Sequence, residues 1–103
     1  MATFSTVTTD NKKYCSILTG IRYDSDNNSL IFYNAQGEAT NFSLDSNIKS
    51  VEIGFQNGNN YQYIQLHKYS SYIEYYDTSS YQRGQYDDLS TVYDLIHRFY
   101  KYT

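Results

Sequence analysis

The sequence predicts an α+β fold, in which a bent antiparallel sheet of about seven short strands is followed by one C-terminal amphipathic helix. Over about residues 3–76, runs that alternate apolar and polar side chains are separated by turn residues, as in antiparallel sheets. From about residue 88 the apolar side chains recur at intervals of three and four, as on one face of a helix. The length of 103 residues is typical of one domain, so we expect a single domain over residues 1–103.

The first hairpin is predicted from two matching apolar patterns. Residues 3–8 are expected to form the first strand, and residues 14–23 the second. After a polar turn, residues 30–34 return antiparallel to the second strand. A register with Ile21 opposite Phe32 brings the apolar faces of both strands to the same side, as a sheet with one buried face requires.

The middle of the chain contains the clearest turn signals. Gly37 supplies the positive φ angle that a tight turn before residues 39–44 favours. Residues 50–55 alternate strictly between apolar and small or polar side chains. Asn57-Gly58 then predicts a two-residue hairpin turn that leads into a strand over residues 60–67.

A tyrosine-rich stretch completes the predicted sheet. Ile, Leu, Val and Phe total 22 of 103 residues, so tyrosine rings are expected both to complete the core and to coat one side of the sheet. Residues 71–76 are expected to pair with residues 60–67, with Tyr61 opposite Tyr76. The outward face of this hairpin would be an aromatic, hydrogen-bonding surface. Residues 78–86 are expected to be a loop.

The C-terminal helix is predicted over about residues 88–101. Asp87 and Asp88 stand where an N-cap and a favourable negative charge belong, and Arg98 and Lys101 lie in the last turn. One face carries the apolar positions Leu89, Val92, Tyr93, Ile96, Phe99 and Tyr100.

Seven short strands followed by such a helix resemble the pleckstrin-homology (PH-like) superfold, and the stretch YDSDNNSLIFYNAQGEATNFSLDSNIKSVEIGF resembles the successive hairpins of GRAM and bacterial PH-like members. The resemblance implies a barrel or half-barrel with the helix at one end. It also implies a lipid head-group site, because Lys12, Lys13 and Arg22 match a region where such domains carry basic residues. Asp24 stands where a further basic residue would help.

Charge and cysteine content limit the classes of partner. The formal net charge is −3, with 8 basic and 11 acidic residues, so nucleic acid is not an expected partner. The absence of an apolar run of about 18 residues predicts no membrane insertion. Cys15 is the single cysteine and the start lacks the pattern of a signal peptide. We therefore expect the protein in the cytoplasm of a host cell or bacterium, or in a virion, and not secreted.

The sequence Asp24–Asn28 opens like a calcium loop, with acidic and amide residues at alternate positions. A calcium loop next needs a glycine and later a bidentate glutamate, but Ser29 and Ala35 occupy those positions. We expect a polar hairpin turn here and no metal.

Nucleophilic catalysis would need Cys15 to meet a histidine. In the predicted register Cys15 faces the core, where a thiol is usually inert packing, and His97 faces solvent beside the apolar stripe of the helix. The chain has no glycine-rich phosphate loop and too few spaced ligands for zinc. We expect no enzymatic activity and no cofactor.

The tyrosine-rich face is the remaining candidate site. Tyrosine is enriched at protein interfaces because it combines a large rigid area with a hydroxyl group. The expected function is a small binding module for a protein partner or for self-assembly, so an oligomer is allowed; it would be a subunit of a larger assembly such as a phage particle, or an inhibitor or adaptor of a host or bacterial complex. Alternatives are a carbohydrate- or lipid-head-group-binding domain, or a tyrosine ladder that only stiffens the sheet. The predicted protein-binding residues are Tyr61, Tyr63, His67, Tyr72, Glu74, Tyr76, Tyr81 and Arg83.

Overall fold

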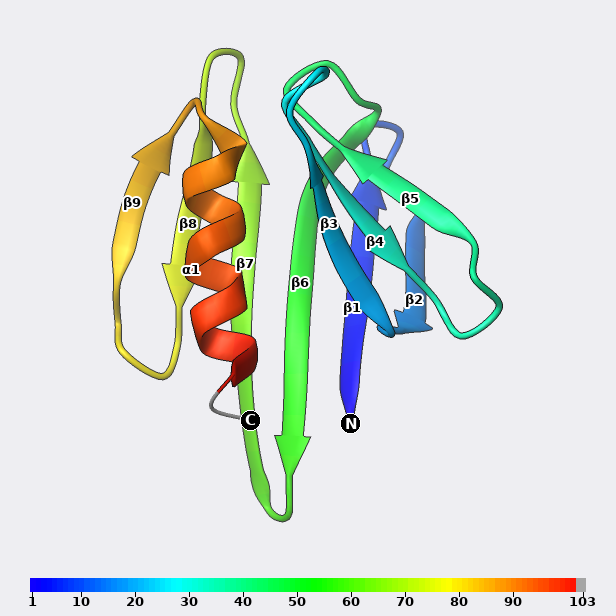
Figure 1. The fold of residues 1–103 in the computed structure, drawn as a ribbon, viewed down its shortest axis with the longest axis vertical. Coiled ribbons are helices and arrows are strands. Elements are labelled where there is room, and N and C mark those ends of the chain that lie inside the picture. The colour runs from blue at the N-terminus through cyan, green and yellow to red at the C-terminus, as the bar shows by residue number, and fades with distance from the viewer. Residues whose placement is uncertain (102–103) are drawn as a thin grey trace.

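The computed structural model describes residues 1–101, apart from the side chains of Asn57 and of residues 99–101. Nine strands and one helix follow one another in this part of the chain, as Figure 1 shows. They are β1 (Ala2–Thr8), β2 (Lys13–Ile17), β3 (Gly20–Asp24), β4 (Ser29–Tyr33), β5 (Ala39–Phe42), β6 (Ile48–Asn57), β7 (Asn60–Lys68), β8 (Ile73–Asp77), β9 (Arg83–Tyr86) and α1 (Leu89–Lys101).

The strands form two antiparallel sheets. The larger has six strands in the order β2-β1-β6-β7-β8-β9, and the smaller has three in the order β3-β4-β5. The small sheet and α1 lie over the same side of the six-stranded sheet, with α1 in front of β7 and β8 (Figure 1). This arrangement leaves the other side of the six-stranded sheet without a covering layer in the described part of the chain.

The core fills the space between the two layers. Phe4 of β1 stacks on Phe32 of β4, with ring centroids 5.5 Å apart, and so joins the two sheets. Most fully buried side chains are aliphatic or phenylalanine, but Tyr75 is also buried, with 1% of its surface exposed. Burial raises the pKa of its hydroxyl, followed by the nearby charge of Asp77. Tyrosine thus completes part of the core, as the low aliphatic content predicts.

Several predicted elements are confirmed. The first strand, the hairpin with Ile21 opposite Phe32 and the C-terminal helix are all present. Gly37 and Gly58 both have positive φ angles, of 78° and 62°, in their turns. The α+β class is therefore correct. The expectation of about seven strands in a barrel or half-barrel is wrong in its count, because there are nine strands among the described residues, and the two sheets do not close into a barrel.

The predicted second strand, residues 14–23, is two strands in two different sheets. The chain crosses between the sheets at Leu18 and Thr19: the Leu18 amide donates to the Ala2 carbonyl at 3.0 Å, and the Thr19 amide donates to the Tyr33 carbonyl at 2.9 Å. Because Leu18 is the buried residue of this crossing, the side chains before it alternate the other way. Cys15 consequently is exposed rather than core-facing.

The pairing of the tyrosine hairpin differs from the prediction by four residues. Tyr76 lies opposite Gln65 and not opposite Tyr61. The cause is the turn: β7 continues to Lys68, which pairs with Ile73, and the Tyr69 amide then donates to the Tyr72 carbonyl at 2.9 Å. A shift by an even number of residues leaves each side chain on its predicted face.

The predicted loop at residues 78–86 contains a strand, β9, which pairs with β8. Its four residues include no aliphatic side chain, so its sequence carries little strand signal. The strand is held by Tyr86, whose ring meets Tyr75 edge-on at 6.5 Å and lies across Gly84.

Candidate protein-binding face

We call the uncovered side of the six-stranded sheet the outer face. Strand pairing fixes which side chains it displays, because residues opposite one another in a sheet point to the same side. One row across the sheet consists of Cys15, Ser5, Glu52, Gln65, Tyr76 and Arg83. The next row consists of Lys13, Val7, Ser50, His67, Glu74 and Gln85.

The structure brings most of the predicted binding residues together on this face. The strands β7, β8 and β9 display Tyr61, Tyr63, His67, Glu74, Tyr76 and Arg83. Tyr72 lies in the turn between β7 and β8, and Tyr81 in the turn between β8 and β9, where 78% of its surface is exposed.

At one end of the face, Tyr61 and Tyr63 form an aromatic pair with ring centroids 5.8 Å apart. The Tyr61 ring lies across Gly54, where a Cβ atom would overlap it. Its hydroxyl donates to a carboxylate oxygen of Glu52 at 3.5 Å. Partial burial of Tyr61, and then the negative charge of Glu52, raise the pKa of its hydroxyl. The ring therefore lies flat along the sheet, and its hydroxyl keeps its proton at neutral pH.

At the other end, three aromatic rings lie in contact one after another. His67 lies 4.8 Å from Tyr69, and Tyr69 stacks on Tyr72 at 4.9 Å, both measured between ring centroids. Tyr69 was not among the predicted site residues, although 41% of its surface is exposed. Its position in a turn gave no strand face to assign it to, so the sequence carried no clear signal for it.

Between these two clusters, Arg83 lies over the ring of Tyr76, with its guanidinium carbon 4.1 Å from the ring centroid. This cation–π contact holds an otherwise flexible side chain flat on the sheet. Tyr76 and Arg83 are directly opposite residues of β8 and β9. The pair therefore presents a flat, partly cationic surface at the centre of the predicted site.

The outer face extends well beyond the predicted residues. A shallow depression of about 390 Å³ adjoins the aromatic clusters over β1, β6 and β7. Its outward-facing lining is mostly small or polar: Ser5, Val7, Lys13, Ser50, Glu52, Gln65 and His67. Sequence reasoning missed this region because β1 and β6, far apart in the chain, become neighbours only through the sheet order.

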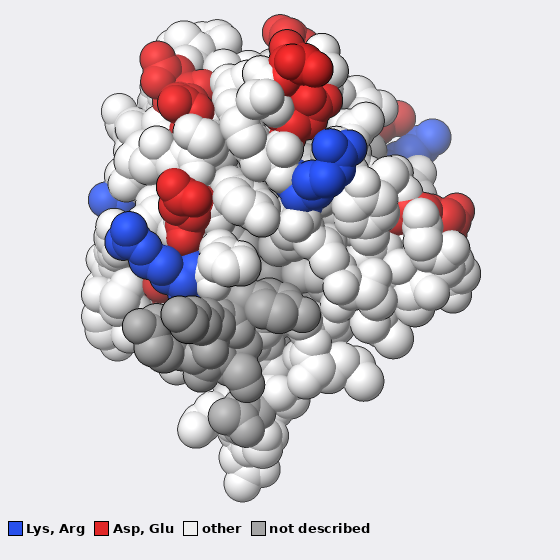
Figure 2. Space-filling model, in the orientation of Figure 1, with Lys and Arg blue, Asp and Glu red and all other residues white. Residues whose placement is uncertain are grey.

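The outer face is close to electrically neutral. The basic side chains Lys13 and Arg83 are balanced by the acidic side chains Glu52 and Glu74. The opposite side of the molecule, which Figure 2 shows, has acidic and basic side chains dispersed among uncharged ones, with no continuous basic area. Neither side thus offers a basic track for a phosphate backbone.

The three basic residues implied by the PH-like resemblance do not share one sheet. Lys12 pairs with Asp10 at 3.7 Å, and Lys13 belongs to β2 in the large sheet. Arg22 belongs to β3 in the small sheet, where its Nε donates to the Tyr33 hydroxyl at 3.3 Å. The lipid head-group site therefore gains no support from their placement.

The calcium-like stretch is a hydrogen-bonded hairpin turn. The carboxylate of Asp24 accepts from the Asp26 amide at 3.0 Å and from the Asn27 side chain at 2.8 Å. These bonds, that of Asn27 first, lower the pKa of Asp24. Asn28 takes the left-handed conformation that the turn needs, with φ of 47°. The predicted polar turn is confirmed.

No catalytic or metal-binding cluster is visible among the described residues, where no three His, Cys, Asp or Glu side chains come close enough to hold a metal ion. Cys15 lies on β2, and three strand spacings, about 14 Å, separate that strand from β7 and His67. His97 lies on α1, over the other side of the sheet.

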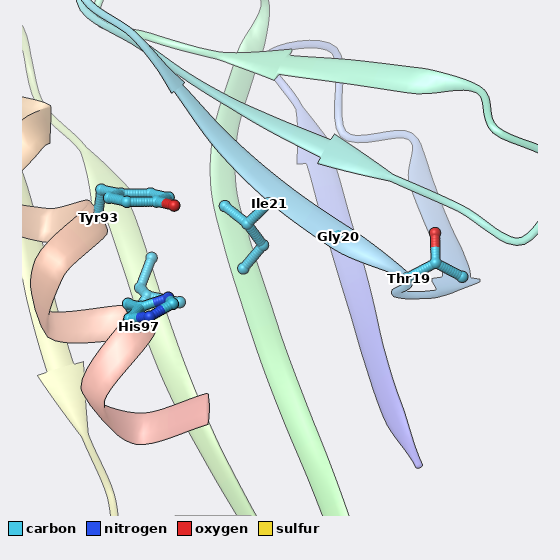
Figure 3. A pocket seen from close by; sticks show the side chains of 6 residues that line it. Thr19, Gly20, Ile21, Tyr93 and His97 are labelled. Atoms are coloured by element: carbon cyan, nitrogen blue, oxygen red, sulfur yellow. The ribbon is translucent and has the colours of Figure 1, made fainter. Parts of the chain in front are cut away.

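A cavity of about 160 Å³ lies between α1 and β3. Figure 3 shows Tyr93 and His97 projecting from the helix toward Ile21, with Thr19 and Gly20 beyond it. The rings of Tyr93 and His97 stack at 6.0 Å. This space accommodates a small apolar group. The titratable side chains that line it are His97 and Tyr93.

Comparison of the chain with protein-family models, curated proteins and solved structures gives no match. The PH-like resemblance therefore stays a prediction. In the part of the chain that the structure describes, no helix has the length and apolar character needed to cross a membrane.

Proposed function

We propose that the protein is a non-enzymatic binding module that contacts a protein partner through its outer face. The observation that carries this proposal is the asymmetry of the six-stranded sheet. One side is buried under α1 and the small sheet, whereas the other displays ordered aromatic rings to solvent. Exposed aromatic groups gathered on one face are typical of interaction sites.

The restraint on these side chains favours binding. The two aromatic clusters and the Tyr76–Arg83 contact restrain the rings before a partner arrives. A restrained side chain loses less conformational freedom on binding, so more of its contact energy contributes to affinity. Tyrosine and arginine are also the residue types that most often dominate interface energetics.

The balance of charge indicates which partner surface fits. With two basic and two acidic side chains on the outer face, long-range steering is weak. We infer a flat, near-neutral partner surface with exposed hydrogen-bond donors and acceptors. The protein would act as a subunit of a larger assembly, such as a phage particle, or as an inhibitor or adaptor of a host or bacterial complex.

Carbohydrate binding is a second candidate, favoured by the depression beside the aromatic pair. Ser50, Glu52 and Gln65 line it and offer hydrogen-bonding groups, and Glu52 also accepts from the hydroxyl of Tyr61. A sugar would stack on that ring and bond to these polar groups. A glycan array separates the candidates, because a saccharide ligand predicts a concentration-dependent signal that Tyr61→Ala removes.

The test of the protein-contact proposal compares three immobilised forms in capture from extracts of the native host. The double variant Tyr63→Ala/Tyr76→Ala removes two rings from the outer face. Tyr33→Ala removes one from the small sheet, on the far side of the molecule, and is the control. Partners retained by the wild type and by Tyr33→Ala, but lost by the double variant, support the proposal. Equal capture by all three forms contradicts it.

A further inference from the structure

Strand β2 forms one edge of the six-stranded sheet and has unused backbone groups. The Leu18 amide donates to the Ala2 carbonyl at 3.0 Å, and the Thr8 amide donates to the Lys12 carbonyl at 2.9 Å. Because hydrogen-bonded pairs alternate along an antiparallel ladder, the even-numbered residues of β2 bond to β1. The N–H and C=O groups of Lys13, Cys15 and Ile17 therefore point away from the sheet.

This edge lacks most of the features that protect edge strands. Its register with β1 contains no bulge, and the chain contains no proline. No described element covers it, and its larger side chains are open to solvent: Tyr14 is 57% exposed and Ile17 46%. Lys13 is its one protective charge. The opposite edge, β9, is shorter and lies against α1.

We propose that β2 pairs antiparallel with β2 of a second copy of this chain, about a two-fold axis at Cys15. Lys13 then lies opposite Ile17 of the second copy, and the two Cys15 residues face each other. All three residues with outward-pointing backbone groups become hydrogen-bonded pairs. The ladder gains six backbone hydrogen bonds, since each such pair exchanges two.

This register is favoured over its neighbours. A shift by two residues in either direction leaves one of the three outward-pointing residues without a strand partner. The proposed register also keeps the two Lys13 side chains at opposite ends of the ladder. Tyr14 lies beside Ser16 of the second copy on the inner side, so its exposed ring gains a neighbour.

The dimer would join two six-stranded sheets into one continuous sheet. A two-fold axis perpendicular to a sheet leaves both outer faces on the same side, with the aromatic clusters at the far ends. The interface is small, so we expect it to form at high protein concentration or when both copies bind one partner. The inference does not depend on the proposed function, because β2 carries none of the predicted binding residues.

Cysteine crosslinking tests the geometry. A hydrogen-bonded antiparallel pair holds its Cα atoms about 5.5 Å apart, which lies within the range of about 4.4–6.8 Å that a disulfide needs. With diamide as the oxidant, wild type should form a covalent dimer at least tenfold faster than Cys15→Ser/Gln85→Cys, whose thiol lies at the β9 edge. Equal rates would indicate random collision and overturn the proposal.

Charge exchange tests the register without a disulfide. In a Cys15→Ser background, Ile17→Lys places a like charge opposite Lys13 of the second copy and should weaken dimerisation at least tenfold in sedimentation equilibrium. Adding Lys13→Glu should restore it, because two cross-strand ion pairs then form. Gln85→Lys at the β9 edge is the control and should have no effect.

Two results would overturn the proposal. One is a monomer at every concentration up to the millimolar range in the Cys15→Ser protein. The other is a dimer that withstands Ile17→Lys but is lost in Gln85→Lys. Unfolding midpoints of the same variants show whether they are folded. Because Ile17 and Gln85 are both exposed, we expect these midpoints to change little.

Discussion

At the scale of single residues, a few polar side chains hold distant segments together. Asn28 is the clearest case: its side-chain oxygen accepts from the Leu89 amide at 2.9 Å and from the Tyr23 hydroxyl at 3.0 Å. Its side-chain nitrogen donates to the Asp87 carbonyl at 2.8 Å. A residue in the turn between β3 and β4 thus caps the first turn of the helix. The sequence identified Asn28 as a turn residue but gave no sign of this second role.

Replacing Asn28 tests this link. Asn28→Ala removes all three bonds and leaves, at φ of 47°, a residue that tolerates the left-handed region less well than asparagine does. We therefore expect a loss of about 2 kcal/mol in unfolding free energy. Asn28→Gly removes the bonds without the strain and should recover part of the loss. Urea denaturation measures both. If Asn28→Ala is as stable as wild type, the contact does not hold the helix start.

Asp88 provides a pH-dependent contribution at the same helix end. The Ser90 hydroxyl and the Ser90 amide both donate to its carboxylate, at 2.6 Å and 2.9 Å, and these bonds lower the pKa of Asp88 below its usual value of 3.8. The predicted N-cap role of Asp88 is therefore confirmed, whereas the structure shows Asp87 taking part through its backbone carbonyl.

The lowered pKa of Asp88 determines how its contribution to stability changes with pH. A carboxyl group with a lowered pKa in the folded state stabilises above pH 3.8 and loses this contribution as the pH falls through its folded value. We expect the midpoint temperature of thermal unfolding to fall more steeply below pH 4 for wild type than for Asp88→Asn. Parallel curves for the two proteins between pH 6 and pH 2 would show that the contact contributes nothing.

At the scale of elements, predictions succeeded where the pattern was local. The β6–β7 hairpin follows from strict alternation around Asn57-Gly58, which needs no knowledge of distant segments. The crossing at Leu18 and Thr19 was missed because apolar side chains continue through it, although the partners change from β1 to β4. β9 was missed because its four residues include no aliphatic side chain, and because the packing of its Tyr86 on Tyr75 is a contact with another strand that a local pattern does not reveal.

The candidate site was predictable because it depends on the face of a strand more than on register. The pairing of β7 with β8 slipped by four residues, yet Tyr61, Tyr63 and Tyr76 all stay on the outer face. Neighbour relations within the site were not predictable. The contact between Tyr76 and Arg83, for instance, requires β9, which was expected to be a loop.

The helix packs against the core along one apolar stripe. Substitutions on that stripe should therefore destabilise the fold, whereas substitutions on the exposed side should not. Ile96 is 1% exposed and packs against the core, so Ile96→Ala should lower the unfolding free energy by about 2–4 kcal/mol. The exposed neighbour Asp94 is the matched control, and Asp94→Ala should change stability by less than about 0.5 kcal/mol. Similar losses in both variants, measured by urea unfolding, would contradict the assigned helix face.

At the scale of the whole molecule, the main feature is the difference between the two sides of the six-stranded sheet: one side is buried and apolar, and the other is exposed and rich in tyrosine. Most of the described aliphatic side chains pack on the covered side, together with Tyr75, Phe4, Phe32, Phe42 and Phe55. The remaining tyrosines include those that coat the outer face, where their hydroxyl groups can reach water or a partner. A chain with few aliphatic residues can thus form a stable core and still display a rigid aromatic surface.

The central claim, that this surface contacts a partner, is tested most directly by hydroxyl-radical footprinting with mass spectrometry. The purified protein is compared with the protein in its native complex, and modification of each tyrosine is measured. We predict that Tyr61, Tyr69 and Tyr76 become protected at least several-fold in the complex, while Tyr33 on the small sheet is modified equally in both. Protection of Tyr33 with unchanged modification of the three outer-face tyrosines would contradict the account.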